Sequence, residues 1–195
     1  MFSTSHLALS GASAQVHWDA GAEAGVTKRF TAGGDAGAPA PGFGPSLELQ
    51  GHLALVPMVR VGAYLGTDLS PVPPDGLRTL WDGGLHLRVT PPLAPWPWRT
   101  WLFAGFGYAF ADDLGPHLPG GFLEVPVGLG FGRKVSSHWM LFTELGARLG
   151  FGFYGRMYDR SAVEPSGESG QTRDGAYVGK DTFALSLSVG LSLEE

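Results

Sequence analysis

Apolar and polar residues alternate one by one along several segments of the chain, which is the period-two pattern of β-strands with two different faces. From Val16 to Thr27, Val, Trp and Ala on one face alternate with His, Asp, Gly and Glu on the other. The segment from Phe183 to Leu193 alternates most regularly. The pattern predicts eight strands, over residues 16–27, 47–55, 59–66, 81–89, 101–110, 124–132, 141–152 and 183–193.

The connectors between these segments alternate in length. Residues 31–42, 67–80, 111–121 and 155–181 form long connectors that are polar or rich in Gly and Pro, whereas 56–58 and 133–138 are short turns. Pro57 marks the tightest turn, and the proline-rich segment 91–100 is the exception to the alternation. Outer-membrane barrels have long extracellular loops and short periplasmic turns. The expected fold class is therefore all-β, an eight-stranded antiparallel up-and-down transmembrane β-barrel, with both termini on the periplasmic side.

The composition supports a membrane location. Charged residues make up 16% of the 195 residues, against about 25% in soluble domains. No apolar run approaches the ~20 residues of a membrane helix, so a spanning chain must form a closed sheet with all its backbone groups paired. We expect one barrel domain over residues 15–195. Residues 1–14, which end in Ala12-Ser13-Ala14, are expected to be a signal-peptide remnant or a disordered leader.

Several kinds of site are disfavoured by the sequence. The absence of Cys excludes disulfides and thiolate metal sites. A net charge of −5 without a basic run argues against a nucleic-acid partner. The glycines of Gly128 to Gly132 lie inside a predicted strand with no helix after it, so they are not a nucleotide-binding loop. We expect no metal and no cofactor, because no two histidines share a ligand spacing; they are His6, His17, His52, His86, His117 and His138.

Three features indicate that the apolar face points to lipid. The polar face is rich in Gly and Ser, which suits a narrow lumen. Lys28, Lys134 and Lys180 all fall at predicted strand ends, away from the mid-span positions where a lipid-facing Lys costs about 2–4 kcal/mol. Aromatic residues gather at two levels, as in interfacial girdles. The periplasmic girdle is expected to contain Trp96, Trp98, Trp101 and Trp139, and the extracellular girdle Phe30, Phe43, Trp81, Phe110, Phe122, Phe153, Tyr154 and Phe183.

The polar face carries the candidate functional residues, a charge network inside the lumen. Its expected members are Asp19, Glu23, Glu48, Arg60, Asp82, Arg88, Glu124, Glu144 and Arg148. Opposite charges should pair there, because an unpaired buried charge costs several kcal/mol. If the turn 133–138 is centred near Ser136, facing residues have numbers that sum to about 272. Arg148 should then oppose Glu124, and Glu144 should oppose Gly128.

The chain resembles the small eight-stranded outer-membrane barrels of the OmpA transmembrane domain, OmpX and OmpW type, from about Gln15 onwards. The segments that carry the likeness are 18–25 (WDAGAEAG), 104–108 (AGFGY) and 124–130 (EVPVGLG). The resemblance implies the outer membrane of a Gram-negative bacterium, with outer-membrane lipid and the barrel-insertion machinery as partners. The chain departs from the family in its last strand, which ends in Leu191-Ser192-Leu193-Glu194-Glu195 instead of the aromatic residue that this machinery reads.

These observations predict a non-enzymatic outer-membrane protein with a structural or surface-interaction role and a polar, plugged lumen. One alternative is a conduit for a small hydrophobic ligand, which the likeness to the OmpW type would allow. Another is a lipid-modifying enzyme, although the H-x-S pair of the lipid A deacylases among such barrels is missing. A soluble calycin-like barrel, with the two faces reversed, is the alternative fold. An apolar pocket opening through the wall would favour the conduit, and a packed polar interior the structural role.

Overall fold

The structure is a computed structural model that describes residues 17–31, 42–72, 76–92, 97–113, 120–154 and 182–195. These residues form eight β-strands. The strands are β1 (Trp18–Thr31), β2 (Phe43–Val56), β3 (Val59–Val72), β4 (Gly76–Val89), β5 (Trp98–Asp113), β6 (Gly120–Lys134), β7 (Trp139–Tyr154) and β8 (Thr182–Glu194).

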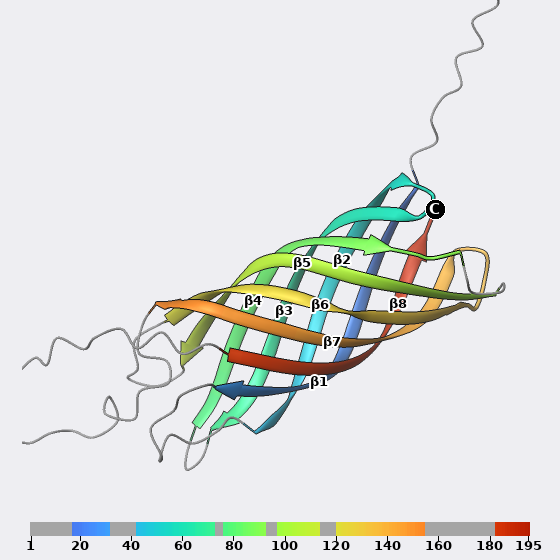
Figure 1. Ribbon diagram of the computed structural model, residues 1–195. Coiled ribbons are helices and arrows are strands. Elements are labelled where there is room, and N and C mark those ends of the chain that lie inside the picture. The colour runs from blue at the N-terminus through green and yellow to red at the C-terminus, as the bar shows by residue number, and fades with distance from the viewer. Residues whose placement is uncertain (1–16, 32–41, 73–75, 93–96, 114–119, 155–181) are drawn as a thin grey trace, which may run out of the picture.

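Each strand pairs antiparallel with the next, and β8 pairs with β1, so the sheet closes into a barrel without free edges (Figure 1). This confirms the predicted fold class. The turns β2–β3, β4–β5 and β6–β7 lie at one end together with the start of β1 and the end of β8, and we call it the turn end. The opposite end, from which the other three connections leave, is the connector end. Within the described part of the chain, no helix is long and apolar enough to cross a membrane.

The strands extend further toward the connector end than the alternation predicted. The predicted connector 67–80 is wrong over most of its length, because β3 continues to Val72 and β4 begins at Gly76, and these two residues pair. Pro71 and other non-alternating residues hid this extension from the sequence pattern. The predicted tight turn at Pro57 is confirmed, since Val56 pairs with Val59. The leader 1–14 and most of connectors 31–42, 111–121 and 155–181 lie outside the described residues.

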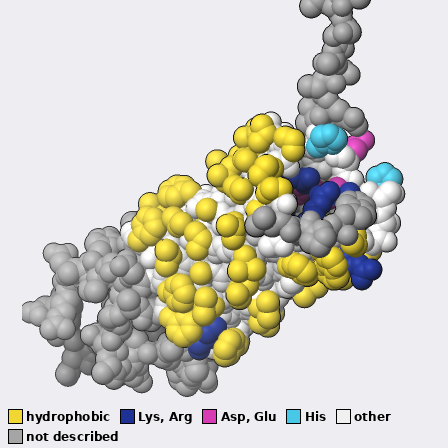
Figure 2. All heavy atoms as spheres, turned by 45° about the vertical axis from the view of Figure 1, so that its right-hand side comes forward, with side chains coloured by type: hydrophobic (Ala, Val, Ile, Leu, Met, Phe, Trp, Pro, Cys, Tyr) yellow, Lys and Arg dark blue, Asp and Glu magenta, His cyan; other side chains and the backbone are white. Residues whose placement is uncertain are grey.

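The apolar face of every strand points outward, as predicted (Figure 2). Leu49 of β2, Leu85 of β4 and Leu187 of β8 are 60%, 64% and 54% exposed. Their polar sequence neighbours Glu48, His86 and Ser188 are buried inside the barrel. A wall of exposed Leu, Val and Phe around a polar interior has the opposite polarity to a soluble barrel, so the alternative calycin-like fold does not apply.

The predicted register between β6 and β7 is wrong by two residues. Pro126, not Glu124, faces Arg148, and Gly130, not Gly128, faces Glu144, so that facing numbers sum to 274. The turn is centred on Ser137, because Lys134 faces Met140. A shift of two residues keeps every side chain on its face, whereas a shift of one would have exchanged the faces.

Candidate functional site in the barrel lumen

Arg148 of β7 is the centre of an ion-pair network in the half of the lumen nearer the connector end. Its Nη1 donates to Asp82 Oδ2 at 2.6 Å and to Glu124 Oε1 at 3.0 Å, and its Nη2 donates to Glu48 Oε2 at 2.5 Å. The three carboxylates come from β4, β6 and β2 and are almost completely buried. One guanidinium therefore connects four strands across the lumen. The predicted pairing of Arg148 with Glu124 is present, although the two residues are diagonal neighbours and do not face each other directly.

Arg29 extends this network toward the connector end. Its Nη1 lies 3.2 Å from Glu124 Oε2, and its Nη2 lies 3.3 Å from Asp68 Oδ2. Arg29 Nη1 also donates a hydrogen bond to Thr182 Oγ1, and Thr27 Oγ1 donates one to Asp68 Oδ1. Glu124 is thus shared by two arginines. The sequence reasoning missed Arg29 and Asp68 because both follow the predicted ends of their strands, although each has the lumen-facing parity of its strand.

In the half nearer the turn end, Arg88 of β4 has the corresponding role. Its Nη2 donates to Glu144 Oε1 at 2.5 Å and to Gln50 Oε1 at 2.7 Å. Trp101 Nε1 donates to the same Glu144 oxygen at 2.9 Å, and the Arg88 guanidinium lies over the Trp101 ring at 5.1 Å. The indole, the guanidinium and the carboxylate therefore close the lumen from β5, β4 and β7.

Two further carboxylates lie at the turn end of the lumen. Asp19 accepts hydrogen bonds from Arg60 Nη1 and, at 2.9 Å, from His52 Nδ1. Glu194 lies 2.7 Å from Arg99 Nη1 and 3.1 Å from Lys134 Nζ. Figure 2 shows the cationic and acidic side chains of this mouth at the end of the apolar wall. Arg99, Lys134 and Glu194 were not predicted as members, although the alternation of β8 gives Glu194 the same face as Ser192.

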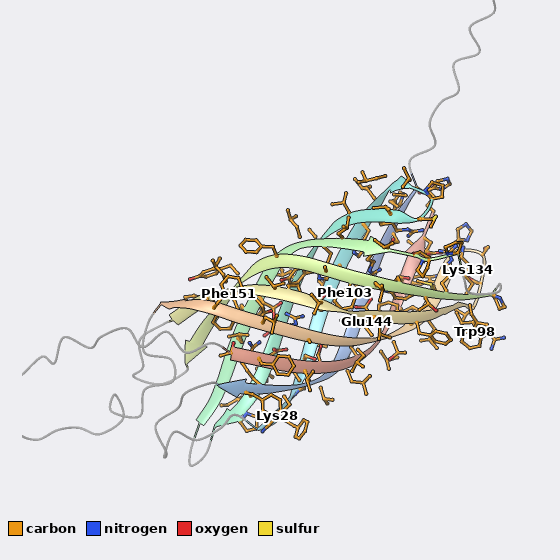
Figure 3. The ribbon with its side chains drawn as sticks, viewed as in Figure 1. Lys28, Trp98, Phe103, Lys134, Glu144 and Phe151 are labelled. Carbon is orange, nitrogen blue, oxygen red and sulfur yellow. The ribbon has the colours of Figure 1, made fainter. Side chains whose placement is uncertain are left out.

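Apolar side chains fill part of the lumen as well, which the sequence reasoning did not foresee. Trp101, Phe103, Met140 and Phe142 form a buried cluster, and Figure 3 shows Phe103 and Glu144 in the middle of the barrel. A cavity lined by residues of the lumen has a volume of about 10 Å³, about the space that one water molecule needs. Its lining includes Glu23, Glu48, His86, Glu144 and Ser188.

Glu23 is the predicted network member with the poorest pairing. It faces the lumen and lines the cavity, but no Lys or Arg of the described residues is within ion-pair distance of it. Its Oε2 atom is buried without a hydrogen-bond partner among those residues. The other predicted members, Asp19, Glu48, Arg60, Asp82, Arg88, Glu124, Glu144 and Arg148, all take part in ion pairs.

Two predicted girdle residues are wrong, since Trp101 is 3% and Phe122 is 0% exposed and both point into the lumen. Glycines on the neighbouring strands make room for them. A Cβ at Gly130 would lie 2.1 Å from Trp101, and one at Gly150 would lie 2.7 Å from Phe122. Trp101 is separated from the lumen-facing Gly105 and Gly107 by an even number of residues. The alternation of β5 could therefore have placed its side chain in the lumen.

The other described girdle residues do face outward. Trp98 and Trp139 lie at the turn end, and Trp81 and Phe183 nearer the connector end, each exposed by 37% to 50%. Phe30, Phe43 and Phe110 also face outward, near the connector end. Trp96 lies outside the described residues, and the side chains of Phe153 and Tyr154 are not among those described.

The histidines form no catalytic or metal-binding set among the described residues. His52 pairs with Asp19 through Nδ1, and its Nε2 is buried without a hydrogen-bond partner among the described residues. His86 stacks between Tyr64 and His52. A hydrogen bond of 2.8 Å joins His138 Nδ1 and Ser137 Oγ in the exposed β6–β7 turn. Within the described ranges no group of three His, Asp or Glu residues is placed to hold a metal ion. These contacts give no support to the lipid-modifying alternative.

Comparisons with known proteins identify the fold. No protein-family model and no curated protein matches the chain. The structure of Neisserial surface protein A, NspA, superposes with a TM-score of 0.63 at 14% identity, over 90% of this chain and 96% of that one. A major outer membrane protein from Thermus thermophilus gives 0.57 at 16% identity, over 93% and 100% of the two chains.

The outer membrane protein OprG from Pseudomonas aeruginosa also superposes, with a TM-score of 0.51 at 10% identity, over 92% of this chain and 95% of that one. Identities this low describe the fold alone. The Thermus and Pseudomonas structures are outer membrane proteins, which agrees with the closed antiparallel topology and the apolar wall found here. The chain therefore has the fold of the small eight-stranded outer-membrane β-barrels.

Proposed function

We propose that the chain is a non-enzymatic protein of the outer membrane of a Gram-negative bacterium, with a structural or surface-interaction role. The closed ladder leaves no strand edge unpaired, which is the condition for a sheet in lipid. The exposed Leu, Val and Phe side chains of the wall supply the apolar belt. Surrounding lipid and the barrel-insertion machinery are its expected partners. The connector end faces the outside of the cell, because long connectors are extracellular in such barrels.

The side chains that cross the lumen are the observation that supports this proposal. Arg148 and Arg88 connect strands across the interior, the Trp101 cluster occupies further space inside the barrel, and the cavity lined by Glu23 and Glu144 has a volume of only about 10 Å³. For a solute to pass, several of these buried ion pairs would have to separate together, and a buried charge without its partner is costly. The barrel is better suited to anchor and present its connectors than to conduct.

Conductance across a planar lipid bilayer tests the plugged lumen. Refolded protein should give no discrete conductance steps in 1 M salt, whereas a general diffusion porin added to the same membrane should give them. Regular steps from the purified barrel would contradict the proposal. Its orientation is tested with epitopes on intact cells, where one inserted near Gly167, outside the described residues, should be labelled and one at Ser136 in the β6–β7 turn should not.

A conduit for small hydrophobic molecules is the second candidate, and one feature of the wall favours it. The β5–β6 pairing is interrupted between the pairs Ala104–Val127 and Gly107–Glu124. Pro126 lies in this interruption and has no N–H to donate, and its side chain lines the small cavity. A conduit through the wall predicts that cells expressing the protein take up a hydrophobic dye faster than cells without it, and that Pro126→Val removes the difference. Equal uptake in all three strains would contradict it.

A further inference from the structure

The outer wall carries charge at two places only, as far as its described side chains show. Among the outward-facing positions of the strands, Lys28 and Arg133 are the charged residues, and the others are apolar, Gly, Thr or Tyr. Lys28 lies near the connector end over the rings of Phe30 and Phe43, at 5.8 and 5.4 Å. Arg133 lies at the turn end. Each charge of this wall is therefore placed over aromatic rings, and Figure 3 shows Lys28 and Trp98, the ring beneath Arg133, toward opposite ends of the barrel.

Arg133 caps a stack of aromatic side chains. It faces Trp98 across the β5–β6 ladder, and its Cζ lies 5.2 Å from the centre of the indole. Trp98 in turn stacks on Phe131, with ring centroids 4.9 Å apart and planes at 22°. Leu129 and Phe131 are the preceding outward residues of β6 and are 45% and 42% exposed. An apolar strip thus runs along β6 and ends at a cation.

Arg133 has no carboxylate partner among the described residues, although carboxylates are near. Its sequence neighbour Lys134 points into the lumen and pairs with Glu194 at 3.1 Å. The guanidinium of Arg133 is exposed on the wall instead. A planar guanidinium presents paired N–H donors that match two phosphate oxygens, and an indole beneath it is the residue preferred at the lipid interface.

We propose that Arg133, Trp98 and Phe131 form a binding site for an anionic phospholipid in the leaflet at the turn end. Arg133 binds the phosphate, Trp98 holds the guanidinium at the level of the headgroups, and an acyl chain lies along Phe131 and Leu129. The inference rests on the proposed membrane location. Insertion is verified separately by the heat-dependent shift of the folded barrel on SDS gels. A chain that inserts without lipid preference contradicts this site alone, and one that fails to insert contradicts the proposed function.

The test is native mass spectrometry of the full chain released from detergent micelles containing dioleoyl phosphatidylglycerol or dioleoyl phosphatidylcholine. Lys28→Gln serves as the parent, so that Arg133 is the remaining cation of the described wall. The parent should bind phosphatidylglycerol more tightly than phosphatidylcholine. Arg133→Gln should weaken phosphatidylglycerol binding about fivefold to tenfold, as expected for the loss of a charge-assisted hydrogen bond, and Arg133→Lys should fall between.

The matched control is Lys134→Gln, which removes the same charge one residue away on the lumen side of the wall. It should leave the affinity for phosphatidylglycerol within twofold of the parent. An equal loss in both variants, or no loss in Arg133→Gln, would overturn the site. Inorganic phosphate added as a competitor should not displace the lipid, because it lacks the acyl chain that contacts Phe131 and Leu129. Full displacement by phosphate would show an anion site and overturn the assignment to a lipid.

Discussion

Replacing Arg148 with alanine is the most informative perturbation of the lumen. Arg148 is the cationic partner of Glu48 and Asp82 among the described residues, whereas Glu124 also pairs with Arg29. The variant would leave two buried carboxylates without a cation. Removal of one partner from a buried ion pair costs about 3–5 kcal/mol. We therefore expect Arg148→Ala to lower the free energy of unfolding by at least about 3 kcal/mol.

Urea unfolding of the barrel in phosphatidylcholine vesicles, followed by tryptophan fluorescence, measures this loss. Arg99→Ala is the matched control, because the Arg99 side chain is 30% exposed and pairs with Glu194 at the mouth. It should cost about 1 kcal/mol or less. The triple variant Arg148→Ala, Glu48→Gln, Asp82→Asn removes the stranded charges and should recover most of the stability. Addition of Glu124→Gln alone should recover less, because Arg29 then loses a partner.

A loss below about 1 kcal/mol in Arg148→Ala, or a triple variant no more stable than the single one, would refute this reasoning. The first result would mean that the lumen is hydrated enough to screen the carboxylates. The second would mean that the loss comes from the packing of the Arg148 side chain, whose guanidinium carbon lies 5.6 Å from the centre of the Tyr64 ring, and not from stranded charge.

Two further predictions concern the wall and the packing of the lumen. Leu187→Arg should destabilise the inserted barrel by about 2–4 kcal/mol and Leu193→Arg by about 0–1 kcal/mol, because both face outward on β8 but Leu193 lies at its turn end; equal losses in vesicle unfolding would count against a lipid-facing wall. Gly130→Ala should cost about 1–3 kcal/mol through overpacking, since its Cβ would lie 2.1 Å from Trp101, whereas Gly51→Ala, with its nearest atom at 3.6 Å, should be nearly neutral in the same assay.

Alternation was sufficient to predict the number of strands, their order and their faces, because one buried face fixes the parity of every residue. It could not give the strand ends. The segments that extend β1, β3 and β4 contain Lys28, Thr67 and Thr79 at outward positions, and these polar residues break the apolar period. The predicted network omitted Arg29 and Asp68 only because both lie beyond the predicted ends of their strands. Both have lumen-facing parity once the strands are extended.

The side chains that fill the lumen were harder to predict, since the lumen selects for shape as well as polarity. Trp101 and Phe122 are apolar and lie near strand ends. The prediction therefore assigned them to the aromatic girdles, on the basis of their residue type and their position along the strand. Their positions depend on Gly130 and Gly150 of neighbouring strands, a relation that requires the register. The predicted register of β6 against β7 was wrong by two residues, because the sequence of the β6–β7 turn does not determine the length of that turn.

The ion pairs of the lumen specify the register more than they add to net stability. Buried ion pairs roughly balance their desolvation cost, so an apolar lumen of similar volume could be as stable. If both faces of the sheet were apolar, however, displacing a strand by one residue would carry no penalty in free energy. In the observed barrel a one-residue slip of β7 would move Glu144 and Arg148 onto the wall. The arginine would cost up to about 2–4 kcal/mol in lipid, and the partners of both residues on β2, β4 and β6 would be stranded. Charges inside thus distinguish the two faces of the sheet and disfavour every closure in which a strand is displaced by an odd number of residues.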